Sequence, residues 1–246
     1  MVTSGKGGVG KTTVTATLGR QLADMGYSVV LVDADVGLNN LDVATGVESR
    51  VVYDLSDVLA GRCSVTQALV ADHESAALVL PSSPACFGLS AQAFRGALEG
   101  LEGDFLLIDC PAGVEEGFHR AVSAAREAIV VTTPSASAIR DADKVIALLS
   151  AYRLDDVSAV VNRVRPDMVS RGEMMSVEEV CALLRVPAIG AVPEDDCITL
   201  YQQLGRVPDF APSEKAFRQL AENVARREKK LTAAVRGRRR RRSFWR

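Results

Sequence analysis

The stretch "SGKGGVGKTT" at residues 4–13 constrains the fold of this chain more than any other feature. It contains the pattern Gly-x-x-x-x-Gly-Lys-Thr from Gly5 to Thr12, which is typical of a phosphate-binding loop between a strand and a helix. The glycines let backbone N–H groups turn around phosphate oxygens, and the positive end of the following helix faces the anion. The motif therefore predicts a nucleotide site in which Lys11 reaches the β- and γ-phosphates and the Thr12 hydroxyl ligates Mg²⁺.

Short apolar runs alternate with helical patterns along the rest of the chain, which predicts repeated βα units. Runs rich in Val, Leu and Ile, typical of strands covered on both faces, lie at 29–35, 76–83, 105–113, 128–134, 157–164 and 188–193. Helical patterns lie at 12–25, 52–60, 90–99, 115–126, 137–151, 175–185 and 196–204, and a longer helix is predicted from Ser213 as N-cap. The fold class is therefore α/β: a doubly wound, mostly parallel sheet with helices on both faces.

The organisation follows from length and charge. We expect a single nucleotide-binding domain at 1–225 and a basic tail at 226–246, because the tail holds eleven Lys or Arg and one Glu. The tail thus carries a charge of +10. Because the net charge of the chain is −2, residues 1–225 carry −12. Only Met1–Thr3 precede the loop, whereas a central strand usually has about five or six residues, so we expect the natural start upstream.

Several classes of protein are disfavoured by what the sequence lacks. No apolar run reaches the ~18 residues of a membrane span, and "MVTSGKGG" has no signal-peptide core, so we expect a cytoplasmic protein. The five cysteines have no zinc or C-x-x-C spacing, which favours free buried thiols. His73 and His119 have no ligand-like neighbours, and we interpret both as surface or structural residues.

Acidic residues at two strand ends complete the predicted site. "FLLID" ends in Asp109, a carboxylate placed to hold the Mg²⁺ waters, as a Walker B aspartate does. "LVDADVG" contains Asp33 and Asp35, which as alternate strand residues face the same way and are expected near the γ-phosphate. We therefore predict a metal site formed by Thr12, Asp33 and Asp109.

Further motifs follow in a consistent order. "KGGVGKTT" is the deviant Walker A motif, and "DADVGLNNLDV", "RVVYDLSDVL", "IDCPAGVEEGF", "VVNRV" and "VPEDD" come after it. From about Val2 to Phe210 the chain resembles the MinD/ParA family of deviant Walker A ATPases. The motifs "RVVYDLSDVL" and "AGVEEGF" favour the division-site branch of that family. The resemblance implies slow, partner-activated ATP hydrolysis by a homodimer that holds two ATP molecules and Mg²⁺ between its chains. It also explains the second lysine of the loop, because Lys6 is expected to contact the ATP of the other chain.

The resemblance also implies roles for individual residues. Asp35 orients the attacking water, and Asn40 assists across the interface. The catalytic set is Lys6, Lys11, Asp35 and Asn40. The nucleotide contacts are Gly5, Lys6, Gly7, Gly8, Val9, Gly10, Lys11, Thr12, Thr13, Asp109, Asn162 beside the adenine, and the backbone from Pro193 to Asp195. Arg140, Asp141 and Asp143 match the surface for a MinC-like division inhibitor. The activator would be a MinE-like protein or a polar scaffold.

The basic tail departs from the family, whose members usually end in an amphipathic membrane helix. Leu231, Ala234 and Val235 begin an apolar stripe, but Gly237 and arginines interrupt its continuation. Basic and aromatic residues still suit the anionic inner leaflet, and this set comprises Arg238, Arg239, Arg240, Arg241, Arg242, Phe244 and Trp245. We therefore predict a cytoplasmic protein that becomes peripheral to the cell membrane in its ATP state.

Alternatives remain open from the sequence. Five consecutive arginines also attract nucleic acid without regard to sequence, so a ParA-type partition ATPase whose ATP dimer binds DNA is the second hypothesis. A regulator of flagellar number is the third. A solvated tail without a partner is the simplest interpretation of the last residues.

Overall fold

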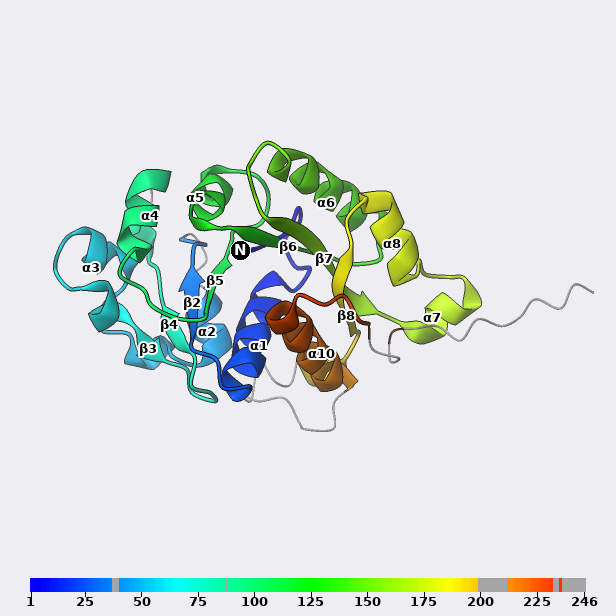
Figure 1. Ribbon diagram of the computed structural model, residues 1–246, viewed down its shortest axis with the longest axis horizontal. Helices are drawn as coiled ribbons and strands as arrows, with labels where there is room; N and C mark the ends of the chain where they lie inside the picture. Colours follow the sequence, from blue (N-terminus) through cyan, green and yellow to red (C-terminus); the bar gives the residue numbers. More distant parts are fainter. Residues whose placement is uncertain (37–39, 87, 199–211, 232–234, 236–246) are drawn as a thin grey trace, which may run out of the picture.

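The computed structural model describes residues 1–36, 40–86, 88–198, 212–231 and 235. In this part of the chain, eight strands form one sheet in the order β3-β4-β2-β5-β1-β6-β7-β8 (Figure 1). The strands are β1 (Val2–Thr3), β2 (Val29–Asp33), β3 (Val70–Ala71), β4 (Leu78–Leu80), β5 (Phe105–Asp109), β6 (Glu127–Thr132), β7 (Asp156–Val164) and β8 (Ala188–Pro193). All neighbours are parallel except β3 and β4. The predicted doubly wound, mostly parallel sheet is confirmed.

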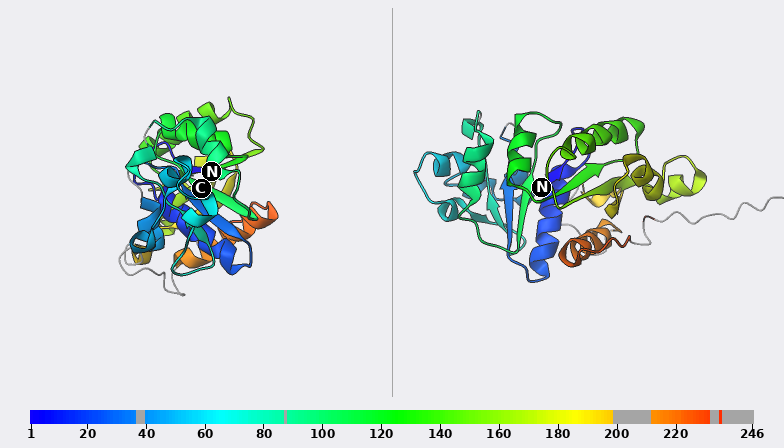
Figure 2. Two further views of the ribbon diagram at one scale, coloured as in Figure 1. Left: turned by 90° about the vertical axis from the view of Figure 1, so that its left-hand side faces the viewer. Right: turned by 45° about the horizontal axis from the view of Figure 1, so that its top comes forward.

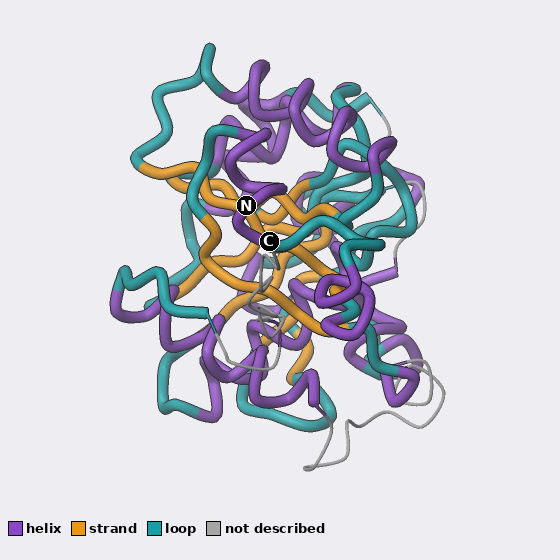
Figure 3. Tube along the Cα trace, turned by 90° about the vertical axis from the view of Figure 1, so that its right-hand side faces the viewer, coloured by secondary structure: helices purple, strands orange, loops and turns teal. Residues whose placement is uncertain are grey.

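Helices cover both faces of the sheet (Figures 1 and 3). The α-helices with described bounds are α1 (Lys11–Asp24), α2 (Asn40–Thr45), α3 (Leu55–Leu59), α4 (Ala91–Leu98), α5 (Glu116–Ala124), α6 (Ala136–Leu149), α7 (Pro166–Arg171), α8 (Val177–Leu184) and α10 (Pro212–Arg226). Three of them begin at a serine N-cap, because the hydroxyls of Ser90, Ser135 and Ser176 accept first-turn N–H groups. The predicted helical stretches correspond to helices, except for 199–204, which lie outside the described residues.

The period-two alternation of the strands divides the core between the two faces. Val30 and Val32 pack in one apolar cluster beneath α4, α5, α6 and α8. Val29 and Leu31 pack in the other cluster, with α1 and α10. Figure 2 shows α1 and α10 lying side by side on their face of the sheet. Both faces of the sheet are therefore buried beneath helices, as the continuous apolar strands predict.

Short elements were not predicted from the sequence. β3 has two residues at the sheet edge, and α2 and α7 have six residues each, so none of them carries a periodic signal. Several strands also end sooner than predicted, since β2 stops at Asp33 and β5 at Asp109. The residues after these strands turn into the loops of the candidate site.

The start of α10 differs from the prediction. The helix begins at Pro212, which suits a first position because its missing N–H needs no partner. Ser213 lies in the first turn, where its N–H and hydroxyl donate to Asp195 Oδ2 at 3.1 and 2.6 Å. The prediction of Ser213 as N-cap is wrong, because the Asp195 carboxylate serves as the acceptor. The predicted helix at 196–204 begins at Asp196, and 199–204 lie outside the described residues.

The described residues after α10, 227–231 and 235, pack on the amino-terminal edge of the sheet. Arg227 pairs with Glu127, the first residue of β6, at 3.0 Å. Lys229 pairs with Asp156, the first residue of β7, at 3.3 Å. Leu231 and Val235 pack against the core. The predicted membrane residues, Arg238 to Arg242, Phe244 and Trp245, lie outside the described residues. Among the described helices, none combines the length and apolarity that a membrane crossing requires.

The thiol and imidazole groups agree with most of the sequence interpretation. All five cysteines are free, but only Cys86 and Cys110 are buried, whereas Cys63, Cys181 and Cys197 are half-buried. His73 and His119 are both exposed. Among the described residues, no cluster of three or more His, Cys, Asp or Glu side chains could hold a metal ion by itself.

Candidate nucleotide-binding site

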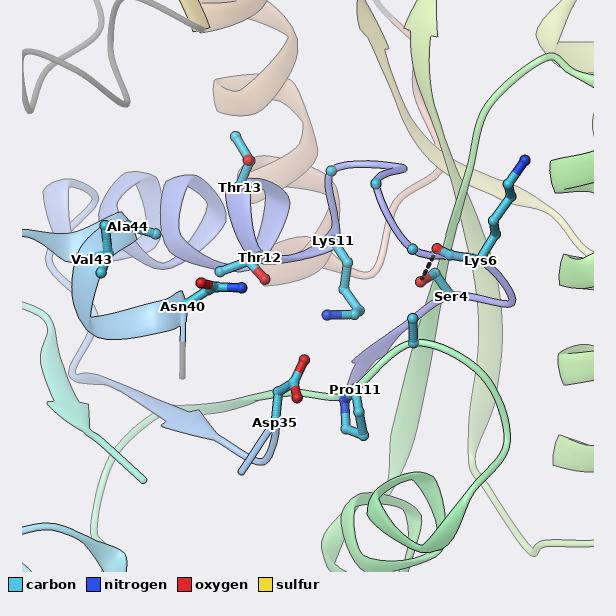
Figure 4. Close-up of a pocket in the computed structure, with 14 residues that line it drawn as sticks. Ser4, Lys6, Lys11, Thr12, Thr13, Asp35, Asn40, Val43, Ala44 and Pro111 are labelled. Atoms are coloured by element: carbon cyan, nitrogen blue, oxygen red, sulfur yellow. Dashed lines mark hydrogen bonds between the residues drawn. The ribbon is translucent and has the colours of Figure 1, made fainter. Parts of the chain in front are cut away.

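A pocket of about 550 Å³ lies at the carboxyl edge of the sheet, beside the loop between β1 and α1 (Figure 4). The position is a topological switch point, because β1 sits between β5 and β6 and the chain winds away from it in both directions. Nine of the predicted site residues line the pocket: Lys6, Gly7, Gly8, Gly10, Lys11, Thr12, Thr13, Asp35 and Asn40. The fold thus brings the predicted loop and the segment after β2 to one place.

Two glycines of the loop are required by close packing. A Cβ atom on Gly5 would lie 2.1 Å from the Asp141 carbonyl oxygen of α6. A Cβ on Gly10 would lie 2.4 Å from Asn162 Nδ2, and Gly10 also has a φ of 91°. Larger residues at these positions would push the loop away from α6 and β7, so the glycines fix the loop against the sheet.

Lys11 and Thr12 line the floor of the pocket, and both contact Asp109, which is 1% exposed and does not itself line the pocket. The Thr12 hydroxyl donates to Asp109 Oδ2 at 2.7 Å, and Lys11 Nζ lies 3.5 Å from Asp109 Oδ1. Thr15, one helical turn after Lys11, donates to Asp109 Oδ1 at 2.9 Å. Burial raises the pKa of the Asp109 carboxyl, and Lys11 and the two hydroxyls oppose that shift. Thr15 was not predicted as a site residue. Its spacing of four residues from Lys11 in "KTTVT" places both on the same face of α1, which would have indicated its position.

This donor set suits Mg²⁺ that arrives with a nucleotide. Mg²⁺ usually keeps several waters and takes one or two protein oxygens together with phosphates, rather than a complete protein cage. The Thr12 hydroxyl and the Asp109 carboxylate are such oxygen donors, and they already face each other. When bound, the ion neutralises charge on the β- and γ-phosphates.

Asp33 and Asp35 take different positions. Asp35 is half-exposed and lines the pocket. Asp33 is 1% exposed, and its carboxylate accepts the N–H of Asp35 at 2.8 Å and of Leu41 at 3.3 Å. It is paired in register with Asp109 on β5. Asp33 therefore holds the segment that carries Asp35, and it does not itself line the pocket.

The buried carboxylates predict a pH-dependent stability of the metal- and nucleotide-free protein. Burial and the charge of Asp109 raise the pKa of Asp33 well above the ordinary value of 3.8. As pH rises above 3.8, the unfolded chain loses this proton while the native state keeps it, so Asp33 lowers the free energy of unfolding until the native group ionises. Asp33→Asn should remove this loss, so the variant's stability relative to wild type should rise with pH.

Urea unfolding of both chains between about pH 4 and pH 8, with chelator present, tests this effect. Carboxyls whose pKa is lowered, such as Asp57 and Asp104, are common to both chains and cancel in the difference. A difference that stays constant across this range would contradict the assignment.

Asn162 on β7 supplies a polar atom suited to a base. Its Nδ2 donates to the Val9 carbonyl at 2.8 Å, and the side chain is 5% exposed. Among the described residues, its Oδ1 atom has no hydrogen-bond partner. An unpaired buried acceptor is costly, and an adenine amino group is a donor that satisfies it. Pro193 and Asp195 lie at and after the end of the neighbouring strand β8, outside the phosphate pocket, and the Asp195 carboxylate is engaged with α10.

Lys6 does not point at the phosphate floor of its own pocket. Its Nζ extends away from Lys11 and donates to Ser137 of α6 at 3.2 Å (Figure 4). The predicted partner residues lie on the same helix: Arg140 and Asp143 are exposed, and Asp141 is half-exposed and pairs with Lys144 at 2.9 Å. Each chain therefore presents Lys6 and the α6 surface beside the opening of its nucleotide pocket.

Comparisons with known proteins show which family the chain resembles. Residues 1–206 match the family of CobQ/CobB/MinD/ParA nucleotide-binding domains. A septum site-determining protein MinD of Synechocystis sp. is 47% identical over 233 residues, which cover 92% of this chain and 87% of the relative.

Solved structures are similar over nearly the whole chain. A chain of the MinC:MinD cell division protein complex of Aquifex aeolicus has a TM-score of 0.87 at 38% identity, covering 94% of this chain and 96% of its own length. MinD of Pyrococcus horikoshii complexed with Mg-ADP has a TM-score of 0.79 at 33% identity, with coverages of 91% and 93%. A ParA family ATPase of Chlorobium tepidum, with a TM-score of 0.75 at 18% identity and coverages of 91% and 98%, shares the fold alone.

Proposed function

We propose a function from the premise that this chain belongs to the CobQ/CobB/MinD/ParA family of nucleotide-binding domains. Within that family, a septum site-determining MinD protein is 47% identical to it over most of both chains. The chain acts in placing the cell-division site, and it uses a nucleotide with Mg²⁺, as the Mg-ADP complex of a relative at 33% identity supports. The DNA-partitioning alternative rests on similarity at 18% identity and is not favoured.

The chemistry that we propose for the site is slow hydrolysis of ATP to ADP and phosphate. Lys11 and the backbone N–H groups of the loop hold the β- and γ-phosphates. Thr12 and Asp109, whose oxygens face each other, hold Mg²⁺. Asp35, which lines the pocket, orients the attacking water, and Asn40, which also lines the pocket, assists across the interface between two chains. Asn162 receives the adenine through its unpaired Oδ1. The site thereby positions the water in line with the leaving group.

We propose further that two chains close on two ATP molecules and that Lys6 crosses to the partner's phosphates. One observation carries this proposal: in a loop that already has Lys11 at the phosphate floor, Lys6 extends away from that floor. A cation supplied from the second chain stabilises charge on the transferring phosphoryl group only after the chains have met. Dimerisation thereby switches hydrolysis on.

Partners follow from the same assembly. We propose that the exposed α6 surface with Arg140, Asp141 and Asp143 recruits a MinC-like division inhibitor, as the complex of the Aquifex relative supports. A MinE-like activator or a polar scaffold completes the cycle. The basic tail brings the ATP dimer to anionic lipid on the inner face of the cell membrane.

Sedimentation velocity combined with phosphate release tests this function. Asp35→Ala should bind ATP, dimerise and fail to hydrolyse it, whereas wild type should dimerise transiently and release phosphate. Both chains should remain monomeric with ADP. A solitary Asp35→Ala chain at saturating ATP would overturn the proposal, and a gel shift of random DNA by the ATP dimer without vesicle binding would favour partition instead.

A further inference from the structure

The short helix α2 forms one wall of the nucleotide pocket, and it is held at both ends. Asn40, Val43 and Ala44 of α2 line the pocket. At the start of the helix, the N–H of Leu41 donates to Asp33. Because six residues are too few for a helix to be stable alone, the position of α2 depends on its contacts with the body, which include these attachments and the buried side chain of Leu41.

The second attachment is a buried ion pair far from the phosphate loop. Arg20 lies in the last half of α1, and Asp72 follows the edge strand β3. Arg20 Nε donates to Asp72 Oδ2 at 2.9 Å and Nη2 donates to Oδ1 at 2.7 Å, which is a bidentate pair. Arg20 is 7% exposed and Asp72 5%. The pair is therefore fixed in geometry and shielded from solvent.

The same guanidinium reaches the end of α2. Nη2 of Arg20 also donates to the carbonyl oxygen of Thr45, the last residue of the helix, at 3.2 Å. A cation at a helix C-terminus satisfies an open carbonyl and favours the helix dipole. Asp72 is itself held, because its Oδ2 accepts from Ser75 Oγ at 2.8 Å and from the N–H of Glu74 at 3.2 Å.

We propose that Arg20 and Asp72 are positioning residues for the nucleotide site: together they fix the C-terminal end of α2 and so hold Asn40 at the pocket. They touch no nucleotide in this assignment, and they act through α2. The expected change in KM for ATP rests on the proposed ATPase function, whereas the expected change in amide exchange of α2 does not depend on activity. It assigns a functional role to a carboxylate on the edge hairpin, which the site motifs do not include.

The test separates positioning from fold stability. Replacing a buried ion pair by apolar residues of similar size is often neutral for stability, whereas breaking it leaves a buried charge. Arg20→Met/Asp72→Leu should therefore keep the melting temperature near wild type and still lose the bond to Thr45. We expect faster amide exchange in α2 and a KM for ATP raised about tenfold, the scale of one hydrogen bond from a charged donor.

Two further variants complete the design. Arg20→Lys retains the charge opposite Asp72 but lacks the planar fork that reaches two acceptors, so its α2 should also exchange faster. Arg50→Met is the matched control, because Arg50 is exposed and donates to the Ala71 carbonyl of the same edge strand at 2.6 Å. The control should leave α2 exchange and KM unchanged.

Each outcome decides the inference. A stably folded double variant with wild-type KM and wild-type α2 exchange overturns it. If the double variant does not fold, α2 exchange in Arg20→Lys decides instead, and a value equal to wild type overturns it. If wild type neither dimerises nor hydrolyses ATP, the proposed function fails, while faster α2 exchange in the variants still supports the positioning role.

Discussion

The Lys6→Ala chain is expected to bind ATP but to remain monomeric, with ATP turnover about 10³-fold below wild type, the lower range for a cation supplied in trans. The reason lies in the direction of the two lysines. Lys11 faces Asp109 at the pocket floor, whereas Lys6 extends to Ser137 and contributes little to its own floor. Single-chain affinity measured with a fluorescent ATP analogue should stay within a few-fold of wild type, since Lys11 and the loop amides remain.

The control is Lys229→Ala. Lys229 pairs with Asp156 at the amino-terminal end of β7, whereas the phosphate-binding loop lies at the carboxyl ends of the strands. The substitution therefore removes one positive charge without affecting the loop. It should dimerise and turn over like wild type. Sedimentation velocity with saturating ATP and a phosphate-release assay give both readouts. Full ATP-dependent dimerisation by Lys6→Ala would show that the lysine does not cross the interface.

The sequence predicted those parts of the site that local pattern encodes. Gly5 to Thr13 are contiguous in the loop and the first turn of α1, and Asp109 ends a continuous apolar strand, so both can be recognised within a short stretch of sequence. The parallel βα order then places strand ends at one edge, which brings Asp35 and Asn162 to the same region without a structure. The continuous apolar runs likewise predicted a sheet that is buried on both faces.

What the sequence did not predict depends on contacts between distant segments. Arg20 and Asp72 are 52 residues apart, and neither lies in a recognisable motif. Ser213 resembles an N-cap by its type, yet Asp195, 18 residues away, supplies the acceptor. Asp33 and Asp35 look equivalent by strand alternation, but the chain leaves β2 at Asp33, so their side chains separate. Side-chain partners at long sequence separation carry no period to detect.

The tail offers the second large effect, which is ATP-dependent binding to anionic vesicles that a chain ending at Arg236 should lose. The truncation removes six arginines, Phe244 and Trp245. Basic residues near an anionic leaflet contribute roughly 1 kcal/mol each, and aromatics favour the headgroup region. Because an ATP dimer carries two tails, the second contact is intramolecular and should raise affinity by about 10²–10⁴ over one tail.

The structure makes this truncation a clean test, because it retains the residues that pack on the body. Asn223 Nδ2 donates to the Lys230 carbonyl at 2.6 Å, and the buried Val235 also remains. ATP-dependent dimerisation should therefore be unchanged in the truncated chain. A full-length Phe244→Ala/Trp245→Ala variant, which keeps every arginine, separates the aromatic from the electrostatic contribution. Binding that weakens with added salt and is absent from neutral vesicles is expected, whereas equal pelleting of the full and truncated chains would exclude the tail as the anchor.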